Sequence, residues 1–166
     1  MVNVIHKPGA RSIKQIELAL ESLKGKVGKV GWFEKSKYDD KAKTPVAYVA
    51  TIQEYGDPAR GIPARPFMRP TIENKQALWR KIAEQGSKNI LEGKDTAQAV
   101  MERIGLRAAG DIRRTISQIW LPPLSPRTIA ARLAKRKKKK ITKGLTKPLI
   151  DTGIMLGTLT NTVEDE

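Results

Sequence analysis

The residues best suited to do chemistry are cations gathered late in the chain. Residues 135–140 read KRKKKK, and the interval between Asp111 and Asp151 holds twelve Lys or Arg residues and no acidic one. Subtracting those twelve charges from the net charge of +15 leaves +3, so the basicity is a local feature. Such a segment neutralises phosphates without reading bases, docks on an acidic partner, or simply stays solvated. All three interpretations stay open here, and the candidate contact residues are Lys135, Arg136, Lys137, Lys138, Lys139, Lys140 and Lys143.

Side chains for catalysis or metal binding are scarce. His6 is the only histidine and there is no cysteine, which removes disulfides, thiolate metal sites and thiol nucleophiles. Carboxylates cluster only at Asp39–Asp40, at Glu54 with Asp57, and at residues 164–166, and a solvated loop or tail explains them better than acid–base work. No phosphate-binding glycine motif is present. We therefore expect no enzymatic activity, no metal and no cofactor.

The length and composition of the chain indicate a single domain without a membrane-spanning segment. A chain of 166 residues with 39% hydrophobic content predicts one domain with a modest core, residues 1–166 together. No apolar run approaches the roughly 18 residues that span a bilayer. The start of the chain lacks the apolar stretch of a signal peptide. We expect a soluble protein made in the cytoplasm, with no membrane association.

Periodicity and capping signals predict the elements that must position these residues. Ser12 and Gln15 form a capping-box pair. The alternation around Val30 and Trp32 predicts a strand, and Asp95 with Gln98 predicts a helix start. Asp151 or Thr152 is expected to cap a short turn before a final strand. The predicted helices cover about residues 12–24, 45–55, 70–92, 95–120, 126–134 and 154–157, and the predicted strands cover about 26–34 and 158–166.

These elements predict an α+β fold in which long amphipathic helices pack on a small, mainly antiparallel sheet. Two strands alone make a marginal sheet. Further strands are therefore expected from residues 2–6 or 35–43, or from neighbouring subunits. Residues 135–147 are expected to form a flexible basic loop, because adjacent cations repel one another and cannot pack. Base stacking is not expected there, because no aromatic residue follows Leu121.

A proline-rich stretch in the middle of the chain is the second candidate site. Residues 56–70, GDPARGIPARPFMRP, cannot form a helix or a central strand and predict a stiff, extended loop. Phe67 is expected to anchor this loop on the core. Because a stiff loop loses little entropy on docking, we expect a subunit interface here, with Arg60, Arg65 and Arg69 available to a neighbour.

Three blocks of sequence together resemble a known family. They are VAYVATIQEYGDPARGIPARPFMRPTI, LSPRTIAARLAKR and KPLIDTGIMLGTLTNTV, in this order over about residues 46–163. The set is similar to the neck or tail-completion proteins of long-tailed bacteriophages, also labelled tail-component or virion-morphogenesis proteins. The shared motifs are Glu-x-Gly at 54–56, PARPFMRP at 63–70, LSPxT at 124–128 and LIDTG at 149–153. Gly157, Thr158 and Leu159 stand where many members have Ser-Ile.

The resemblance implies a structural virion protein at the head–tail junction, assembled in the host cytoplasm. It implies a homo-oligomeric ring around the DNA channel, expected as a hexamer or dodecamer, and no catalysis. Its partners would be connector or head-completion proteins, tail-terminator or tail-tube proteins, and genomic DNA through phosphate contact. The alternative is a cytoplasmic nucleic-acid-binding protein that uses the polybasic segment. That alternative explains the pI of about 10.2 but not the proline-rich loop or the DTG segment.

Overall fold

The computed structural model describes residues 12–137 and 145–165 and confirms an α+β fold. Helices dominate the described residues, and two strands far apart in the sequence form one antiparallel sheet. The elements are α1 (Ile13–Glu21), β1 (Lys26–Gly31), α2 (Val46–Tyr55), the 3-10 turn η1 (Pro58–Arg60), α3 (Met68–Leu91), α4 (Ala97–Gln118), α5 (Pro126–Lys137), α6 (Ile154–Thr158) and β2 (Thr160–Asp165).

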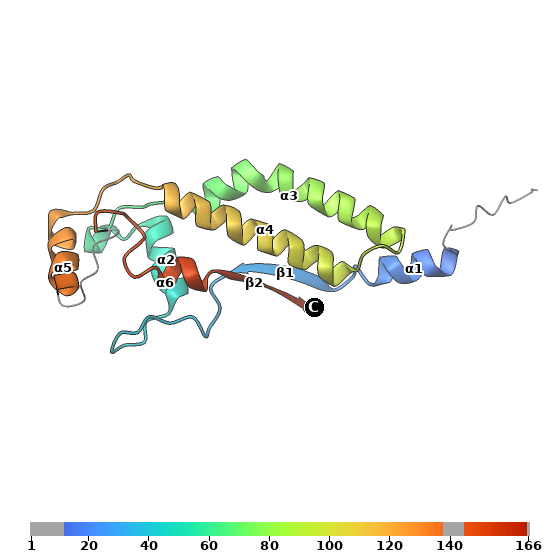
Figure 1. Cartoon of the computed structure of the whole chain (residues 1–166), viewed down its shortest axis with the longest axis horizontal. Coiled ribbons are helices and arrows are strands. Elements are labelled where there is room, and N and C mark those ends of the chain that lie inside the picture. Colours follow the sequence, from blue (N-terminus) through green and yellow to red (C-terminus); the bar gives the residue numbers. More distant parts are fainter. Residues whose placement is uncertain (1–11, 138–144, 166) are drawn as a thin grey trace, which may run out of the picture.

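The molecule is elongated, and α3 and α4 form an antiparallel helical hairpin along its length (Figure 1). Helix α4 lies between α3 and the sheet and contacts both. Strands β1 and β2 run antiparallel from the pair Lys26–Asp165 to the pair Gly31–Thr160. Helix α1 lies at one end of the hairpin, whereas α2, α5 and α6 lie at the other. The pairing of β1 with β2 therefore joins the N-terminal and C-terminal parts of the described chain in one sheet.

Glycine allows the two long helices to approach closely. A Cβ added at Gly86 of α3 would lie 2.4 Å from Cγ1 of Val100 on α4, well inside van der Waals contact. Likewise, a Cβ at Gly105 would lie 2.8 Å from the side chain of Asn161 on β2. Both α3 and β2 therefore pack tightly against α4.

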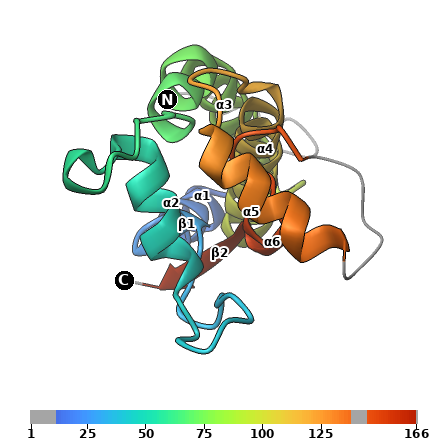
Figure 2. The same cartoon turned by 90° about the vertical axis from the view of Figure 1, so that its left-hand side faces the viewer.

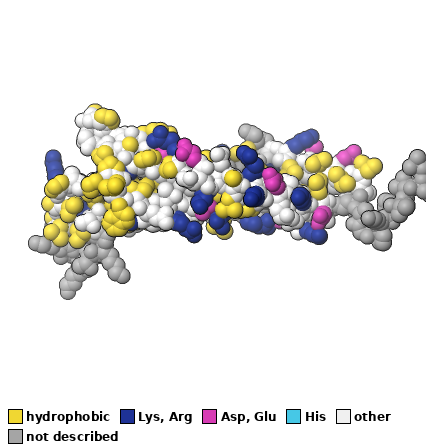
Figure 3. All heavy atoms as spheres, turned by 90° about the horizontal axis from the view of Figure 1, so that it is seen from above, with side chains coloured by type: hydrophobic (Ala, Val, Ile, Leu, Met, Phe, Trp, Pro, Cys, Tyr) yellow, Lys and Arg dark blue, Asp and Glu magenta, His cyan; other side chains and the backbone are white. Residues whose placement is uncertain are grey.

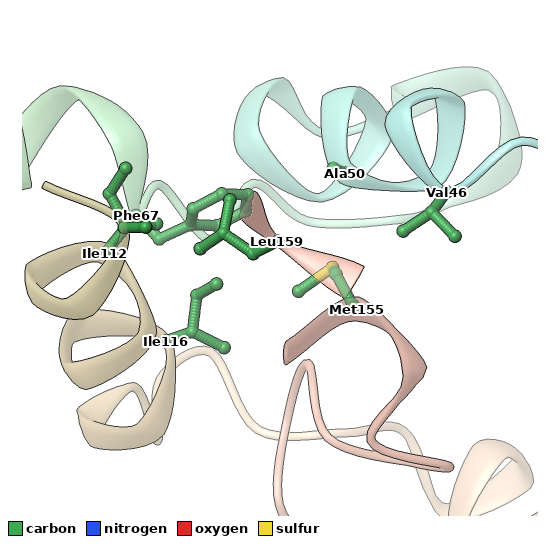
Figure 4. Close-up of a cluster of buried hydrophobic side chains, with 8 residues drawn as sticks. Val46, Ala50, Phe67, Ile112, Ile116, Met155 and Leu159 are labelled. Carbon is green, nitrogen blue, oxygen red and sulfur yellow. The ribbon is translucent and has the colours of Figure 1, made fainter. Parts of the chain in front are cut away.

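Two groups of buried side chains hold the fold together. The main core sits where α2, α4 and α6 meet the start of α3 (Figure 4), and a smaller one joins α1, α3 and α4. Trp32 packs edge-on against the Phe67 ring, with 5.8 Å between ring centroids, and its Nε1 donates to the Met155 carbonyl oxygen. The main core contains Val46, Ala50, Phe67, Ala109, Ile112, Ile116, Met155 and Leu159.

Local signals place several helix starts correctly, but the starts of α4 and α6 differ from the predictions. The capping box of Ser12 and Gln15 is present at α1. The cap of α4 is Thr96 rather than the predicted Asp95, because the Thr96 hydroxyl accepts from the Ala99 N–H. Asp95 instead pairs with Arg103 at 2.9 Å. The residue before α6 is Gly153, in left-handed conformation, and neither Asp151 nor Thr152 holds that position.

Other boundaries also differ from the predictions. Strand β1 ends at Gly31. The expectation that residues 56–70 form no helix is wrong in two places, because η1 occupies Pro58–Arg60 and α3 begins at Met68, ahead of Pro70. Of the expected extra strands, residues 2–6 lie outside the described residues, and the 35–43 stretch makes only the isolated bridge Lys37–Pro45. The described sheet therefore has two strands.

Helix α5 extends further than predicted. Helix α5 continues through Lys137, so residues 135–137 are helical rather than part of a loop. Lysine and arginine have good helix propensity, and the repulsion between neighbouring cations on a helix is only a few tenths of a kcal/mol per pair. Residues 138–144 lie outside the described residues.

Candidate functional site

The three motif blocks come together at one end of the molecule. We call this region the motif end and define it as residues 45–69, 119–137 and 145–159. Viewed from that end, α2, α5 and α6 lie in front of the long hairpin (Figure 2). Three side chains connect its segments. Glu54 joins α2 to the start of α3, Arg65 joins the proline-rich loop to the segment before α5, and Arg132 joins α5 to residues 147–151.

Glu54, on α2, caps the N-terminus of α3. Its carboxylate accepts the backbone N–H of Phe67 at 2.7 Å, of Met68 at 2.9 Å and of Arg69 at 3.2 Å. The cap residue Phe67 has no polar side chain to do this. Glu54 is only 3% exposed, and the Arg69 Nε donates to the same carboxylate at 3.1 Å. The glutamate of the Glu-x-Gly motif thus fixes α2 to the start of α3.

The hydrogen bonds to Glu54 determine its ionisation. Burial by itself would raise the pKa of Glu54, but the backbone N–H groups of Met68, Phe67 and Arg69, helped by the Arg69 side chain, together lower it. A carboxylate with a lowered pKa stabilises the fold above its unfolded pKa, and this stabilisation disappears as the pH falls through the folded pKa.

We predict that acid destabilisation of the protein contains a contribution from Glu54. Starting below about pH 4.5, the free energy of unfolding should fall more steeply with decreasing pH in the wild type than in Glu54→Gln. Denaturant melts between pH 7 and pH 3 measure this difference. Parallel pH profiles for the two proteins would contradict the prediction. Exposed Glu84→Gln is the control and should retain the wild-type slope.

Gly56, which ends α2, needs to be glycine. Its φ of +80° is one that other residues rarely adopt, and an added Cβ would lie 2.8 Å from the backbone N of Ala64. The chain turns here into η1 and returns through the bridge Asp57–Ile62. The glycine of the Glu-x-Gly motif therefore allows the proline-rich loop to fold back on α2.

Arg65 has an internal position, which corrects the expectation that it reaches toward a neighbouring subunit. It is 4% exposed. Its Nε donates to the Pro122 carbonyl oxygen at 2.8 Å, its Nη2 to that of Pro123 at 3.0 Å, and its Nη1 to the Gln53 side chain at 3.3 Å. Burial, and then the charge of Arg132, lower the pKa of Arg65. Its hydrogen bonds hold the segment that leads into α5.

Arg132 makes the equivalent connection from α5 to the last motif block. Its Nη1 donates to the carbonyl oxygens of Lys147 at 2.8 Å and Ile150 at 3.2 Å, and its Nε lies 3.5 Å from the Asp151 carboxylate. Leu149 between them has a φ of +61°, a left-handed conformation unusual for leucine. Arg132 thus holds the bend of the LIDTG motif.

Of the other predicted interface residues, Phe67 lies in the core, whereas Arg60 and Arg69 lie at the surface. Phe67 is fully buried, as expected of the residue that anchors the loop, so its ring is not part of a surface. Arg60 is exposed and donates to the Tyr48 hydroxyl at 3.3 Å. The half-exposed Arg69 lies over the Tyr55 ring at 4.8 Å. Arg60 and Arg69 remain available to a partner, together with the two tyrosines.

The basic segment begins at the same end of the molecule. Lys135 is exposed on α5, and Arg136 and Lys137 belong to the last turn of that helix. Lys138, Lys139, Lys140 and Lys143 lie outside the described residues. Where the chain resumes, Lys147 Nζ lies 3.7 Å from the centre of the Trp120 ring. An aromatic ring therefore lies against one lysine that follows the basic segment, although no aromatic residue follows Leu121 in sequence.

Exposed apolar side chains also lie at this end of the molecule. Trp120 is 58% exposed and Leu121 is 77% exposed. In the space-filling view, hydrophobic side chains gather at the end that carries α5, whereas cationic and acidic side chains alternate along the hairpin (Figure 3). A surface that combines tryptophan, tyrosine and arginine has the composition of a protein–protein interface.

The described residues hold little that could do covalent chemistry. Asp111 is buried, but its carboxylate accepts from Trp79 Nε1 at 3.0 Å and from Arg107 Nε at 3.1 Å, so it ties α3 to α4. Among residues 12–137 and 145–165, no three His, Cys, Asp or Glu side chains converge as metal ligands. No helix in this part of the chain has the length and apolar character to cross a bilayer.

Sequence reasoning missed the three connecting residues. It grouped Glu54 with Asp57 as a solvated acidic pair, treated Arg65 as a surface cation and gave Arg132 no role. One signal was available for Glu54: the start of α3, Phe-Met-Arg-Pro, contains no Ser, Thr, Asp or Asn to cap it. An uncapped helix start predicts that a side chain from elsewhere satisfies its N–H groups.

Comparisons with known proteins give this chain no relatives: no family model, no curated protein and no solved structure matches it.

Proposed function

We propose that this protein is a structural subunit at the head–tail junction of a long-tailed phage particle. It would join the tail to the connector as a homo-oligomeric ring around the DNA channel. The observation that carries the proposal is the motif end. The segments that carry the family-like motifs, separated by up to about a hundred residues, connect to one another through Glu54, Arg65 and Arg132.

The surface of the motif end supports binding to other proteins. Arg60 with Tyr48 and Arg69 with Tyr55 form exposed aromatic–arginine pairs, and Lys147 with Trp120 forms an aromatic–lysine pair. Connector or head-completion proteins and tail-terminator or tail-tube proteins are the partners that the resemblance implies. The basic segment that begins at Lys135 would contact an acidic surface of such a partner or the phosphates of the packaged DNA.

Assembly and complementation together test the proposal. The purified protein should form a closed ring visible by electron microscopy, and the gene should restore infectivity to a phage that lacks it. Particles made without the protein should contain filled heads and separate tails. Joined, infectious particles in its absence would refute the proposal. A monomer that binds nucleic acid tightly would favour the alternative of a cytoplasmic nucleic-acid-binding protein.

We predict that the basic segment acts through charge alone. Changing Lys137, Lys138, Lys139 and Lys140 together to Gln should weaken binding to DNA or to an acidic partner and flatten its dependence on salt, because each lost phosphate contact reduces the salt slope by about one. The melting temperature should change little, because exposed charges contribute little to stability. Titrations between 50 and 300 mM salt, on roughly the scale where such contacts are screened, measure the slope.

The matched control replaces four cations on the long hairpin, Lys75, Arg80, Lys81 and Lys88, by Gln. This variant has the same net charge as the first. If binding depended only on the net charge of the protein, both variants would therefore bind equally weakly. Full infectivity of a phage supplied with the variant of residues 137–140 would mean that the segment is only solvated surface.

A further inference from the structure

The small sheet has two outer edges that no described residue occupies. Strands β1 and β2 pair with each other, and the other bridges in the described chain, Lys37–Pro45 and Asp57–Ile62, lie elsewhere. An open edge presents unpaired N–H and C=O groups and is a template for another strand. A sheet of two strands is also at the lower limit of stability, so a further strand would strengthen it.

A groove runs beside the open edge of β2. It has a volume of about 580 Å³ and lies between β2 and α4, with Leu106, Glu102 and Ala99 on the helix and Asn161 and Val163 on the strand. Leu106 projects into solvent here with 64% of its surface exposed. An added strand would therefore pair with the β2 backbone. A helix packed on that strand would then cover the groove and Leu106.

The charges on the two strands indicate which strand fits. Strand β1 carries Lys26 and Lys29, and β2 carries Glu164 and Asp165. Within the chain Lys29 Nζ lies 2.5 Å from Glu164, and Lys26 pairs with Asp165. A β1 strand from a second copy, placed antiparallel on the open edge of β2, would meet the same acidic residues. Two β2 strands paired with each other would bring only acidic charge to the sheet.

The spacings of strands and helices are compatible with this addition along α4 and the sheet. Strands in a sheet lie about 4.8 Å apart, so two strands per copy displace the next copy by roughly 9.5 Å. Packed helices lie about 8–10 Å apart. Because α4 covers the two strands of its own copy, the α4 helices of neighbouring copies would then lie side by side on one continuous sheet. The groove beside β2 would be filled by the second copy's strand and helix.

We propose that β1 of a second copy of this chain adds to the open edge of β2, so that copies assemble head to tail through one continuous antiparallel sheet. The contact is heterologous, because it joins different surfaces of the two copies, and repetition of such a contact produces a ring or a filament. It would be the subunit contact of the proposed ring and in this respect rests on the proposed function. It assigns the contact to the sheet and leaves the motif end to other partners.

Single cysteines test the pairing directly, because the chain has no cysteine of its own. Lys29 and Thr162 are paired within the chain, on the sheet face away from α4, and the same pairing would recur between copies. Lys29→Cys and Thr162→Cys are made as separate variants, one carrying a larger tag, then mixed by unfolding and refolding and treated with a short thiol cross-linker. The expected product is the mixed dimer and not either homodimer.

A second variant tests the groove. Leu106→Glu places a carboxylate in the proposed contact and should shift the protein from the assembled mass to the 18.4 kDa subunit. Because Leu106 is exposed, the subunit should keep its fold and its circular dichroism spectrum. The control is Leu133→Glu, an exposed leucine on α5 at the other end of the molecule, which should assemble as the wild type does.

The outcomes separate this contact from the proposed function. Homodimers of Thr162→Cys alone would indicate a two-fold contact between β2 edges and would overturn the head-to-tail pairing. Rings that form normally with Leu106→Glu and give no mixed dimer would leave the head–tail role intact and refute the sheet contact. Mixed dimers from a protein that does not complement the phage would support the contact and refute the role.

Discussion

Replacement of Glu54 by alanine is expected to lower the free energy of unfolding by about 3–5 kcal/mol, because a buried acceptor of several backbone hydrogen bonds is lost. The variant leaves the N–H groups of Phe67, Met68 and Arg69 without their acceptor, and the first two lie in or beside the main core. Each buried donor left unsatisfied costs about 1–3 kcal/mol. The melting temperature should fall by roughly 10 °C for a protein of this size.

A second variant at this position separates the charge of Glu54 from its shape, and a variant at another position serves as the control. Glu54→Gln keeps one acceptor oxygen but brings an NH₂ group toward donors, so its stability should lie between those of the wild type and the alanine variant. Glu84→Ala, at an exposed position on α3, should change the free energy of unfolding by no more than about 0.5 kcal/mol. Urea unfolding followed by tryptophan fluorescence measures all three. A loss below about 1 kcal/mol in Glu54→Ala would show that water replaces the carboxylate.

The sequence predicts the helices well because their signals are local. Ser12 with Gln15, Gly56, and Ser125 with Pro126 each mark a boundary within a few residues of where the structure has it. The pairing of β1 with β2 could not be predicted in the same way, because Lys26 and Asp165 are 139 residues apart. Periodicity identified both strands, but nothing local says that they are partners.

The candidate site was harder to predict than the fold. A stretch with four prolines and three arginines reads as exposed, and the structure agrees for Arg60 and Arg69. It disagrees for Arg65, since two acceptors of this buried guanidinium are backbone carbonyl groups 57 and 58 residues away. Backbone carbonyls leave no signature in a sequence. The role of the basic segment stays a prediction, since most of it lies outside the described residues.

Replacement of Arg65 by alanine is expected to lower the free energy of unfolding by about 2–4 kcal/mol and to loosen α5 selectively. Hydrogen bonds from a charged group contribute about 1.5–3 kcal/mol each, and the desolvation of the buried guanidinium offsets part of their sum. Arg65 holds Pro122 and Pro123, which lead into α5, and α5 lies apart from the long hairpin. Loss of Arg65 should therefore destabilise α5 more than α3 or α4.

Hydrogen exchange measured by mass spectrometry distinguishes a local from a global effect. In Arg65→Ala, amides of residues 119–137 should exchange faster, while those of the α3–α4 hairpin keep most of their protection. Arg65→Lys should restore less than half of the lost stability, because one ammonium group cannot reach Pro122, Pro123 and Gln53 in the geometry of the guanidinium fork. The exposed Arg80→Ala on α3 is the control for a lost charge. Unchanged exchange in residues 119–137 would mean that Arg132 alone holds α5, since its bonds to Lys147 and Ile150 remain in every one of these variants.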